Sequence, residues 1–358
     1  MNVRVLVVDD TIMYRKVVGD ILAGIPGVDV VGTANNGKIA LARIASLKPD
    51  LITLDVEMPI MDGLETLQEI KKICPELGVI MLSTLTKRGS DITMKALELG
   101  AFDFIAKPDA EAREENIQAL HSALVPRIQA FAKRMELKKL LGQRTARPAP
   151  AVISAPAPVT PAPTARRTGK SKAVAIGIST GGPNALATML PQVPKLGVPV
   201  FIVQHMPPVF TKSLAESLDA KCQLAVREAT HNEPVLPDVV YIAPGGKHMR
   251  VATGAAGSKI IQITEDPPEN NCRPAVDYLF RSVAREYGGL TTGVIMTGMG
   301  GDGTLGLRVL KSFGAVTIGQ DEESCVVYGM PKLAFEAGVV DVVCPLNMIA
   351  TEIVRTVR

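Results

Sequence analysis

A long segment rich in proline and alanine divides the chain in two, and this division limits the folds that the sequence can adopt. The segment runs from about Arg144 to Lys172 and reads RTARPAPAVISAPAPVTPAPTARRTGKSK. It has no apolar period with which to bury a face, so it is expected to be a semi-extended linker. A chain of 358 residues suits two domains, each with its own core. We predict domains at residues 1–122 and 171–358 and a linker at 123–170, Pro- and Ala-rich from about residue 144.

Short apolar runs alternate with segments of helical period on both sides of this linker. The apolar runs before it are VRVLVV, VDVVGTA, DLITLDV, GVIMLS and FDFIAK, and those after it are KAVAIGI, PVFIVQH, VVYIAP, GVIMT and AVTIG. Helical period occurs in TIMYRKVVGDIL, ETLQEIKKI, NALATMLPQ, FTKSLAESLD and GTLGLRVLKSF. This alternation predicts two α/β domains with parallel sheets. In such sheets functional residues gather at the carboxyl ends of the strands.

The composition excludes several classes of function. Lys and Arg number 39 against 36 Asp and Glu, the net charge is +3, and aromatic residues make up 4%. The chain therefore lacks the basic and aromatic surface that nucleic acid requires, and we expect no nucleic-acid partner. Five cysteines without a C-x-x-C spacing favour a reducing compartment. With no signal peptide and no apolar stretch of roughly 18 residues, we expect a cytoplasmic protein with no direct membrane insertion.

Acidic residues end two of the predicted N-terminal strands. Asp9 and Asp10 follow VLVV, and Asp55 follows LITL. A single aspartate in such a place often only caps the next helix. Three carboxylates at one edge of a sheet, however, suit a hard divalent cation such as Mg²⁺. Ser83 and Lys107, which end the fourth and fifth strands, would lie on the same edge.

Residues 1–120 resemble a two-component receiver domain, which has a flavodoxin-like, doubly wound fold. The order of the acidic pair, the later aspartate, the hydroxyl and the Lys-Pro matches this family, as do MPIMDG and LGA. The resemblance implies that Asp55 is phosphorylated and that Mg²⁺ binds to Asp9, Asp10 and Asp55. It also implies receiver switch roles for Lys107 and for Ser83, with the neighbouring Thr84 as the alternative hydroxyl.

A serine between two glycines follows the first strand of the second domain. Ser179, in GISTGGPN, matches the G-x-S-x-G turn that presents a nucleophile, although a serine at a helix start is also a common N-cap. His205, in FIVQHM, follows the next strand and would reach the same edge, and His248, in PGGKHM, is the rival base. Asp302, in GVIMTGMGGDG, is the candidate acid that orients the histidine.

The same glycine loop also fits a dinucleotide-binding fingerprint. Gly298, Gly300 and Gly303 spell G-x-G-x-x-G after a strand, with Asp321 about twenty residues further on. Asp302 would then face a pyrophosphate with a like charge, at the place where a helix N-terminus favours an anion. The loop is better suited to orienting a histidine and stabilising an oxyanion.

Six motifs together resemble the catalytic domain of the chemotaxis protein-glutamate methylesterase family. They are GISTGGP, FIVQHMPP, YIAPGGKHM, CRPAVD, MTGMGGDG and DEESCVVYGMP. The resemblance implies a parallel-sheet α/β hydrolase domain with a Ser-His-Asp triad, in a chain order that differs from that of α/β-hydrolases. Ser179 would be the nucleophile, His205 the general base and then acid, and Asp302 the orienting acid. Met299 would supply an oxyanion N–H, with Thr180 beside the nucleophile.

This family resemblance also implies the reaction and its partners. The substrates would be methyl-accepting chemotaxis receptors, whose glutamate methyl esters are hydrolysed and some of whose glutamines are deamidated during sensory adaptation. A chemotaxis histidine kinase would be the phosphodonor, and the catalytic domain would need no cofactor. Two alternatives stay open, a receiver-controlled binding module with a vestigial triad and a nucleotide-dependent enzyme. Arg273 fits either the substrate pocket or a surface ion pair, and Tyr241 fits packing.

Overall fold

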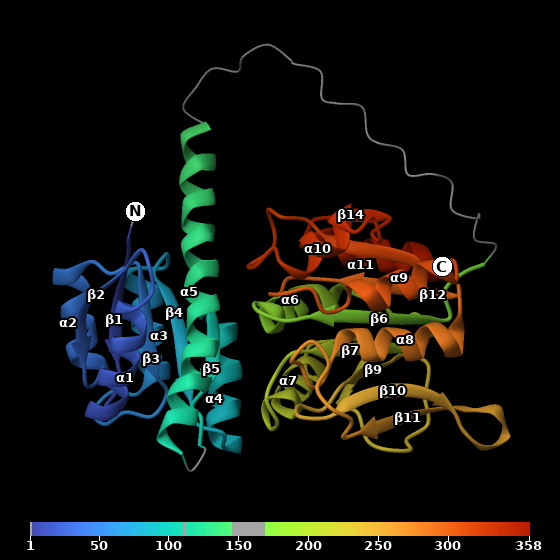
Figure 1. Ribbon diagram of the computed structural model, residues 1–358, viewed down its shortest axis with the longest axis horizontal. Helices are drawn as coiled ribbons and strands as arrows, with labels where there is room; N and C mark the ends of the chain where they lie inside the picture. The colour runs from blue at the N-terminus through green and yellow to red at the C-terminus, as the bar shows by residue number, and fades with distance from the viewer. Residues whose placement is uncertain (1, 110–111, 145–168) are drawn as a thin grey trace.

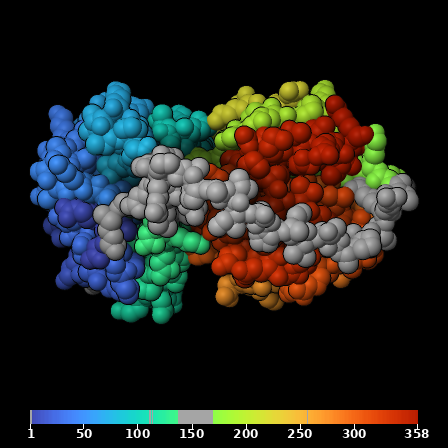
Figure 2. Space-filling model, turned by 90° about the horizontal axis from the view of Figure 1, so that it is seen from above, coloured from blue at the N-terminus to red at the C-terminus, as the bar shows by residue number. Residues whose placement is uncertain are grey.

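The computed structural model describes residues 2–109, 112–144 and 169–358, which form two α/β domains lying side by side (Figures 1 and 2). The Pro- and Ala-rich part of the predicted linker, residues 145–168, lies outside the described residues, and the domain boundaries stay a prediction. Residues 123–144 belong to the long helix α5 (Arg113–Arg144). Among the described residues, no helix combines the length and the apolar character that crossing a membrane requires.

The N-terminal domain has a parallel five-stranded sheet in the order β2-β1-β3-β4-β5. Its strands are β1 (Val3–Val8), β2 (Val28–Ala34), β3 (Leu51–Asp55), β4 (Gly78–Ser83) and β5 (Asp103–Ala106). The helices are α1 (Ile12–Ala23), α2 (Gly37–Leu47), α3 (Gly63–Ile73), α4 (Lys87–Glu98) and α5. The five strands coincide with the five predicted apolar runs to within two residues at each end.

The alternation of side chains along β1 explains why this sheet is covered on both faces. Val5 and Val7 are buried with residues of α1 and α5. Leu6 and Val8 point the other way and are buried with residues of α2, α3 and α4. Successive side chains of a strand face opposite sides of a sheet, so two layers of helices are needed to bury it. The predicted doubly wound fold is confirmed.

The C-terminal domain has a seven-stranded parallel sheet in the order β14-β13-β12-β6-β7-β9-β8. Its strands are β6 (Ala173–Ile178), β7 (Val200–Gln204), β8 (Ala225–Glu228), β9 (Val239–Ile242), β12 (Thr291–Ile295), β13 (Val316–Gln320) and β14 (Val342–Cys344). An antiparallel hairpin, β10 (His248–Thr253) and β11 (Lys259–Thr264), lies outside this sheet. The chain order reverses between β6 and β12, and such a reversal opens a crevice at the carboxyl edge.

Helices cover both faces of this second sheet as well. They are α6 (Gly182–Met189), α7 (Phe210–Asp219), α8 (Val276–Tyr287), α9 (Thr304–Ser312), α10 (Met330–Glu336) and α11 (Leu346–Val357). Helix α8 lies close to β6 because Gly177 has no side chain. A Cβ at Gly177 would be 2.3 Å from Cγ1 of Val276 and 3.2 Å from Cδ1 of Ile295. The glycine therefore fixes how deeply the start of α8 sits on the sheet.

The two domains meet through α4 and β5 on one side and α6 and α7 on the other. The rings of Phe104 and Phe210 stack with centroids 4.6 Å apart. The Ser213 hydroxyl contacts the Ser90 hydroxyl at 2.8 Å and donates to Asp91 at 2.7 Å. Apolar side chains from both domains belong to one continuous buried cluster. The N-terminal domain is thus packed onto the helices that follow β6 and β7.

We expect Gly177→Ala to lower the free energy of unfolding of the C-terminal domain by about 1–3 kcal/mol, the usual cost of overpacking a core. The control is Gly19→Ala in α1, where an added Cβ has no neighbour within 4 Å. Alanine in an open helix position should keep or raise stability, by about 0.5–1 kcal/mol. Urea unfolding followed by circular dichroism measures both. Equal midpoints for Gly177→Ala and wild type would contradict the tight contact between β6 and α8.

Candidate functional site

Ser179 lies in the tight turn between β6 and α6. Its N–H donates to the Thr297 carbonyl at 2.9 Å, and its carbonyl accepts from the Gly182 N–H at 2.8 Å. Gly181 has a φ of 73°, which a residue with a side chain rarely adopts. A Cβ at Gly298 would be 2.6 Å from Cβ of Ser179. Glycines therefore make the turn and leave space beside the half-buried serine.

His205 follows β7 directly and is held in register with β6. Its N–H donates to the Ile178 carbonyl at 3.1 Å, and the Gln204 side chain donates to the Ser179 carbonyl at 2.9 Å. The ring Nε2 lies 2.8 Å from Oδ2 of Asp302, and the His205 side chain is 14% exposed. The predicted histidine and acid are therefore brought together at the carboxyl edge of the sheet.

The Asp302 carboxylate is buried and accepts hydrogen bonds from two directions besides His205. The Val276 and Asp277 N–H groups at the start of α8 donate at 2.6 and 3.0 Å, and the Asn270 side chain donates at 2.9 Å. Burial alone would raise the pKa of Asp302, but the hydrogen bond with His205 and those from the backbone lower it below its ordinary value. Asp302 is therefore an anion that also caps the N-terminus of α8.

The ionised acid fixes which His205 nitrogen is available for chemistry. Because Nε2 faces a carboxylate, it carries the proton of the neutral ring, and Nδ1 is left as the basic nitrogen. Burial lowers the pKa of His205, but hydrogen bonds with Asp302 and Cys272 outweigh it and raise the pKa to about 9. The Cys272 thiol lies 3.8 Å from Nδ1. Within the described residues, no hydrogen bond joins the Ser179 hydroxyl to His205.

Two further predicted residues lie beside this turn. Met299 is half-buried, and its N–H has no hydrogen-bond partner among the described residues. Such an N–H is free to bind an oxyanion. Thr180 is buried, and its carbonyl accepts from the Thr297 hydroxyl at 3.0 Å. Its contribution is to the conformation of the turn after Ser179.

Three other side chains that the sequence analysis discussed, those of His248, Tyr241 and Arg273, contact other parts of the C-terminal domain. His248 is fully buried and stacks on Tyr278, with centroids 4.4 Å apart. Its Nδ1 accepts from the Ala275 N–H and its Nε2 contacts the Pro267 carbonyl, so it has no nitrogen to offer as a base. Tyr241 is fully buried, which confirms its packing role. Arg273 is exposed and donates to backbone carbonyls, at 3.2 Å for the nearer one.

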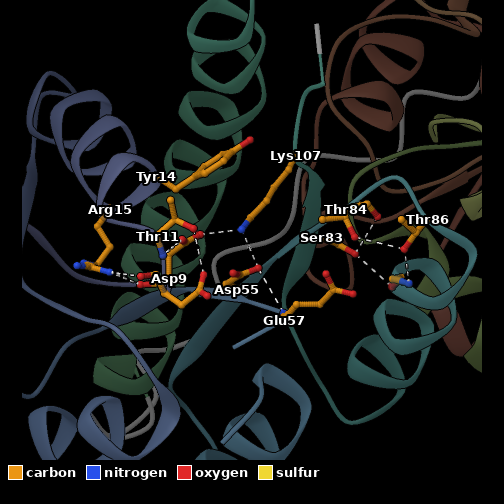
Figure 3. A network of polar contacts seen from close by, with 12 residues as sticks. Asp9, Thr11, Tyr14, Arg15, Asp55, Glu57, Ser83, Thr84, Thr86 and Lys107 are labelled. Carbon is orange, nitrogen blue, oxygen red and sulfur yellow. Dashed lines mark hydrogen bonds and ion pairs between the residues drawn. The ribbon is translucent and has the colours of Figure 1, made fainter. Parts of the chain in front are cut away.

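The acidic residues predicted in the N-terminal domain meet at the carboxyl edge of its sheet (Figure 3). Lys107 Nζ lies 2.8 Å from an oxygen of Asp9 and 2.8 Å from an oxygen of Asp55, both of them buried. Asp10 is exposed, and one ligand oxygen from each of the three carboxylates lies within 4.8 Å of the others. Lys107 also lies over the ring of Tyr14, 4.5 Å from its centroid. The edge therefore gathers three anions around one cation.

This cluster has fewer hydrogen-bond donors than its carboxylates require. Burial raises the pKa of Asp55 to about 6, although Lys107 acts in the opposite direction. Oδ2 of Asp9 is buried and accepts no hydrogen bond, and Lys107 is its ion-pair partner. A divalent cation with oxygen ligands would supply the missing positive charge. The donor set of Asp9, Asp10 and Asp55 therefore fits Mg²⁺.

Ser83 lies on the same edge but does not contact Asp55. Its buried hydroxyl donates to the Gly89 carbonyl at 3.1 Å, at the start of α4 (Figure 3). The Lys107 N–H donates to the Ser83 carbonyl at 2.6 Å. The hydroxyl of Thr84 instead contacts that of Thr86 at 3.3 Å. The predicted switch residue therefore has its side chain turned toward α4.

The sequence analysis missed the residues that hold Asp302 in place. Asn270 has a φ of 54° and belongs to the turn before α8, and its amide also donates to Asp277 at 3.0 Å. The adjacent asparagines Asn270 and Asn271, followed closely by Pro274, are a turn signal that precedes a helix. Cys272 is the first residue of the CRPAVD motif, but the sequence analysis predicted no function for it.

Comparisons with known proteins agree with this geometry. The family model for CheB methylesterase matches residues 174–353, and that for the response regulator receiver domain matches residues 5–119. A protein-glutamate methylesterase/protein-glutamine glutaminase of Desulfotalea psychrophila is 56% identical over 364 residues, covering 100% of this chain and 99% of the relative. One of Bacillus subtilis with the same name is 44% identical over 358 residues, covering 99% of each.

A solved structure is similar to the C-terminal domain. The crystal structure of the Thermotoga maritima CheB methylesterase catalytic domain is 43% identical and has a TM-score of 0.50. The match covers 52% of this chain and 99% of that one. With relatives matched over their full length and both family models in the predicted order, the chain belongs to the CheB methylesterase family and has a response regulator receiver domain at its N-terminal side.

Proposed function

We propose that this chain removes methyl esters from glutamate side chains of chemotaxis receptors, deamidates receptor glutamines, and is activated by phosphorylation of Asp55. The observation that carries the proposal is the hydrogen bond between the buried, ionised Asp302 and His205. His205 follows β7, the strand that pairs with β6, and the Ser179 turn follows β6. The names of the relatives, protein-glutamate methylesterase and protein-glutamine glutaminase, support both reactions.

In the proposed first step, which requires the neutral form of His205, the Ser179 hydroxyl attacks the ester carbonyl and its proton moves to Nδ1 of His205. The Asp302 carboxylate stabilises the imidazolium through Nε2. The developing oxyanion accepts a hydrogen bond from the Met299 N–H, which has no other partner within the described residues. His205 then gives the proton to the methoxy oxygen as its bond to the carbonyl carbon breaks and methanol leaves, or to the amide nitrogen, which leaves as ammonia, when the substrate is a glutamine. An acyl-enzyme on Ser179 remains.

In the second step, water replaces the leaving group. His205 takes a proton from the water, which attacks the acyl carbonyl, and the proton then passes back to Ser179 as the bond breaks. The products are a glutamate side chain and free Ser179. An ester and a primary amide at the same position pass through the same kind of tetrahedral anion, so one site serves both reactions.

The proposed regulation begins with phosphorylation of Asp55, for which a chemotaxis histidine kinase is the proposed donor. Asp55 is the acceptor, Lys107 pairs with the phosphoryl oxygens, and Ser83 turns to bond them. Asp9, Asp10 and Asp55 would hold Mg²⁺, which neutralises phosphoryl charge when bound. The ion pairs of Lys107 with Asp9 and Asp55 support its role.

The receiver packs close to the Ser179 turn. This packing supports a control in which the unphosphorylated receiver covers the approach to Ser179. The Asn184 side chain, on α6, donates to the Ala101 carbonyl of the receiver at 3.1 Å. Val326 packs against the receiver core and also fills the space beside Gly181. A receptor segment that approaches Ser179 must therefore pass close to the receiver. Undocking on phosphorylation would open this path.

Ser179→Ala or His205→Ala should lower methyl-ester turnover by several powers of ten, because triad members act as one unit. Asp302→Asn should cost about 10⁴-fold, since the histidine loses its orienting anion. Release of methanol from methylated receptors, and turnover of a simple methyl ester, are the measurements. The exposed Ser258→Ala and His121→Ala are matched controls that should keep activity. If Ser179→Ala retained a tenth of wild-type turnover, the serine would not be the nucleophile.

A second prediction concerns phosphorylation of the receiver. Labelling by a small phosphodonor should require Mg²⁺ and should be lost in Asp10→Asn, because the carboxylate cluster then holds the cation too weakly. Asp20→Asn, an exposed change in α1, should label like wild type. The isolated C-terminal domain, which lacks the carboxylate cluster, should keep its methyl-ester turnover. Full labelling in the presence of EDTA would contradict the role of the cluster.

The third prediction compares three initial rates on methylated receptors. Removing residues 1 to about 145 should raise basal turnover and abolish its dependence on phosphodonor, because the covering receiver is gone. Asp55→Asn should stay slow and unresponsive. A coupling of about 1–3 kcal/mol between the sites corresponds to roughly 5- to 150-fold activation. If the truncated protein is no faster than the unphosphorylated full chain, the receiver acts only as a positive effector.

A charge exchange at the interface controls for nonspecific effects of truncation. Lys221 and Ser217 of α7 and its following turn both donate to Glu98 of α4. Glu98→Lys should raise basal turnover by up to about fivefold, since exposed ion pairs contribute up to about 1 kcal/mol. Adding Lys221→Glu should restore part of the low rate. Identical rates in the single and double variants would show that this pair does not hold the domains together.

A further inference from the structure

We propose that His205 and Cys272 form a binding site for a soft divalent cation, with Zn²⁺ as its representative, and that the bound ion inhibits the enzyme. Nδ1 of His205 and the Cys272 sulfur are the two protein ligands. The inhibitory half of this inference rests on the proposed function, because it assumes that Nδ1 accepts the serine proton. The binding half does not.

The separation of the two candidate ligand atoms suits a tetrahedral ion. Zn²⁺ binds sulfur at about 2.3 Å and imidazole nitrogen at about 2.0–2.1 Å, so two tetrahedral ligands lie about 3.6 Å apart. Nδ1 of His205 and Sγ of Cys272 are 3.8 Å apart. Neither side chain is fully buried, and water can complete the coordination of the ion. Binding requires that the thiol, and Nδ1 of His205 where it is protonated, release their protons to solvent.

Asp302 completes the site without contacting the ion. One of its oxygens lies within 4.8 Å of a ligand atom of His205 and of the Cys272 sulfur. Its oxygens, however, already accept hydrogen bonds from His205, Asn270 and the start of α8. A histidine that binds a metal usually donates its other N–H to a carboxylate, which fixes the ring and raises its basicity. The Nε2 bond to Asp302 is this arrangement. The triad acid therefore serves equally well as the outer partner of a metal ligand.

The ligand chemistry distinguishes this site from the receiver cluster. Thiolate and imidazole favour Zn²⁺ and similar ions, whereas Asp9, Asp10 and Asp55 offer only carboxylate oxygens, which favour Mg²⁺. Among the described residues these are the two groups of three metal-ligand side chains, and Cys272 is the cysteine that belongs to one. Excess Mg²⁺ can therefore occupy the receiver while the second site is titrated.

Occupation of this site would stop the proposed reaction at its first step. The lone pair of Nδ1 that accepts the Ser179 proton would be bound to the ion. The ester itself would be untouched, and removal of the ion would restore the rate. Inhibition should therefore be reversible by a chelator.

The binding test uses the full chain, with Co²⁺ as a spectroscopic substitute for Zn²⁺ and excess Mg²⁺ present. One equivalent of Co²⁺ should produce a thiolate-to-cobalt absorption band in the near ultraviolet, and Zn²⁺ should displace it. Cys272→Ser and Cys272→Ala should both lose the band, while Cys222→Ser, a matched change of a half-buried cysteine just after α7, should keep it. Absence of the band in wild type, or its persistence in both Cys272 variants, would overturn the site.

The inhibition test measures methyl-ester turnover over a range of Zn²⁺ concentrations, each protein being compared with its own metal-free rate. Loss of an outer-shell partner alone costs about 10- to 100-fold in metal affinity, so loss of the thiolate should raise the inhibitory concentration at least tenfold. A Cys272-dependent band with no effect of Zn²⁺ on the rate would overturn the inhibitory half. If no protein turns over the ester without metal, the proposed function fails, and the band still decides the site.

Discussion

The Asp302 carboxylate is the group on which the geometry of the catalytic edge depends. It joins three separate parts of the chain, because it lies in the loop after β12, holds His205 after β7 and caps α8. Asp277, in the first turn of α8, accepts a hydrogen bond in its turn, from the Gly306 N–H of α9 at 2.6 Å. Asp302 therefore binds the N-terminal end of α8, which contains Asp277, and Asp277 binds the N-terminal end of α9, which follows Asp302. Since a buried carboxylate without donors would be very costly, the turn at Asn270, the start of α8 and the glycine loop must all be in place for the histidine to be oriented.

The receiver domain uses buried carboxylates in the opposite way. Asp302 has enough donors to lower its pKa, whereas burial raises the pKa of Asp55 to about 6 despite the ion pair with Lys107. The first arrangement is complete and rigid, which suits a group that must only orient a neighbour. The second lacks positive charge, which suits a group whose function begins when a cation and a phosphoryl group arrive. The same residue type at the same kind of sheet edge therefore has its pKa shifted in opposite directions by the number of donors around it, which suits the two proposed roles.

The sequence predicts the five strands of the N-terminal sheet and five of the seven strands of the C-terminal sheet because each is a short apolar run, but it misses β8, β14 and the hairpin of β10 and β11. This pattern placed Asp55, Lys107 and His205 correctly at the edges of their sheets. The sequence analysis overlooked α8, which helps to position Asp302, although a helical period is present in its buried residues Val276, Leu279, Phe280, Val283 and Ala284. It also could not show the contact between Cys272 and His205, which lie 67 residues apart and meet only through the turn at Asn270. The residues through which the domains dock were beyond sequence reasoning as well, since Phe104 and similar side chains are as apolar as ordinary core residues.

The proposed phosphoacceptor site is connected to the domain interface through the first turns of α4. This short connection makes the proposed control physically reasonable. Ser83 donates to the Gly89 carbonyl, and two residues later Asp91 accepts from Ser213 of the catalytic domain. A phosphoryl group on Asp55 that draws the Ser83 hydroxyl toward itself would remove one donor from the first turn of α4. A typical hydrogen bond contributes about 0.5–1.5 kcal/mol, and couplings between sites are about 1–3 kcal/mol. The loss of one or two such bonds at this turn is therefore enough to shift the docking equilibrium, and no rearrangement of either core is needed.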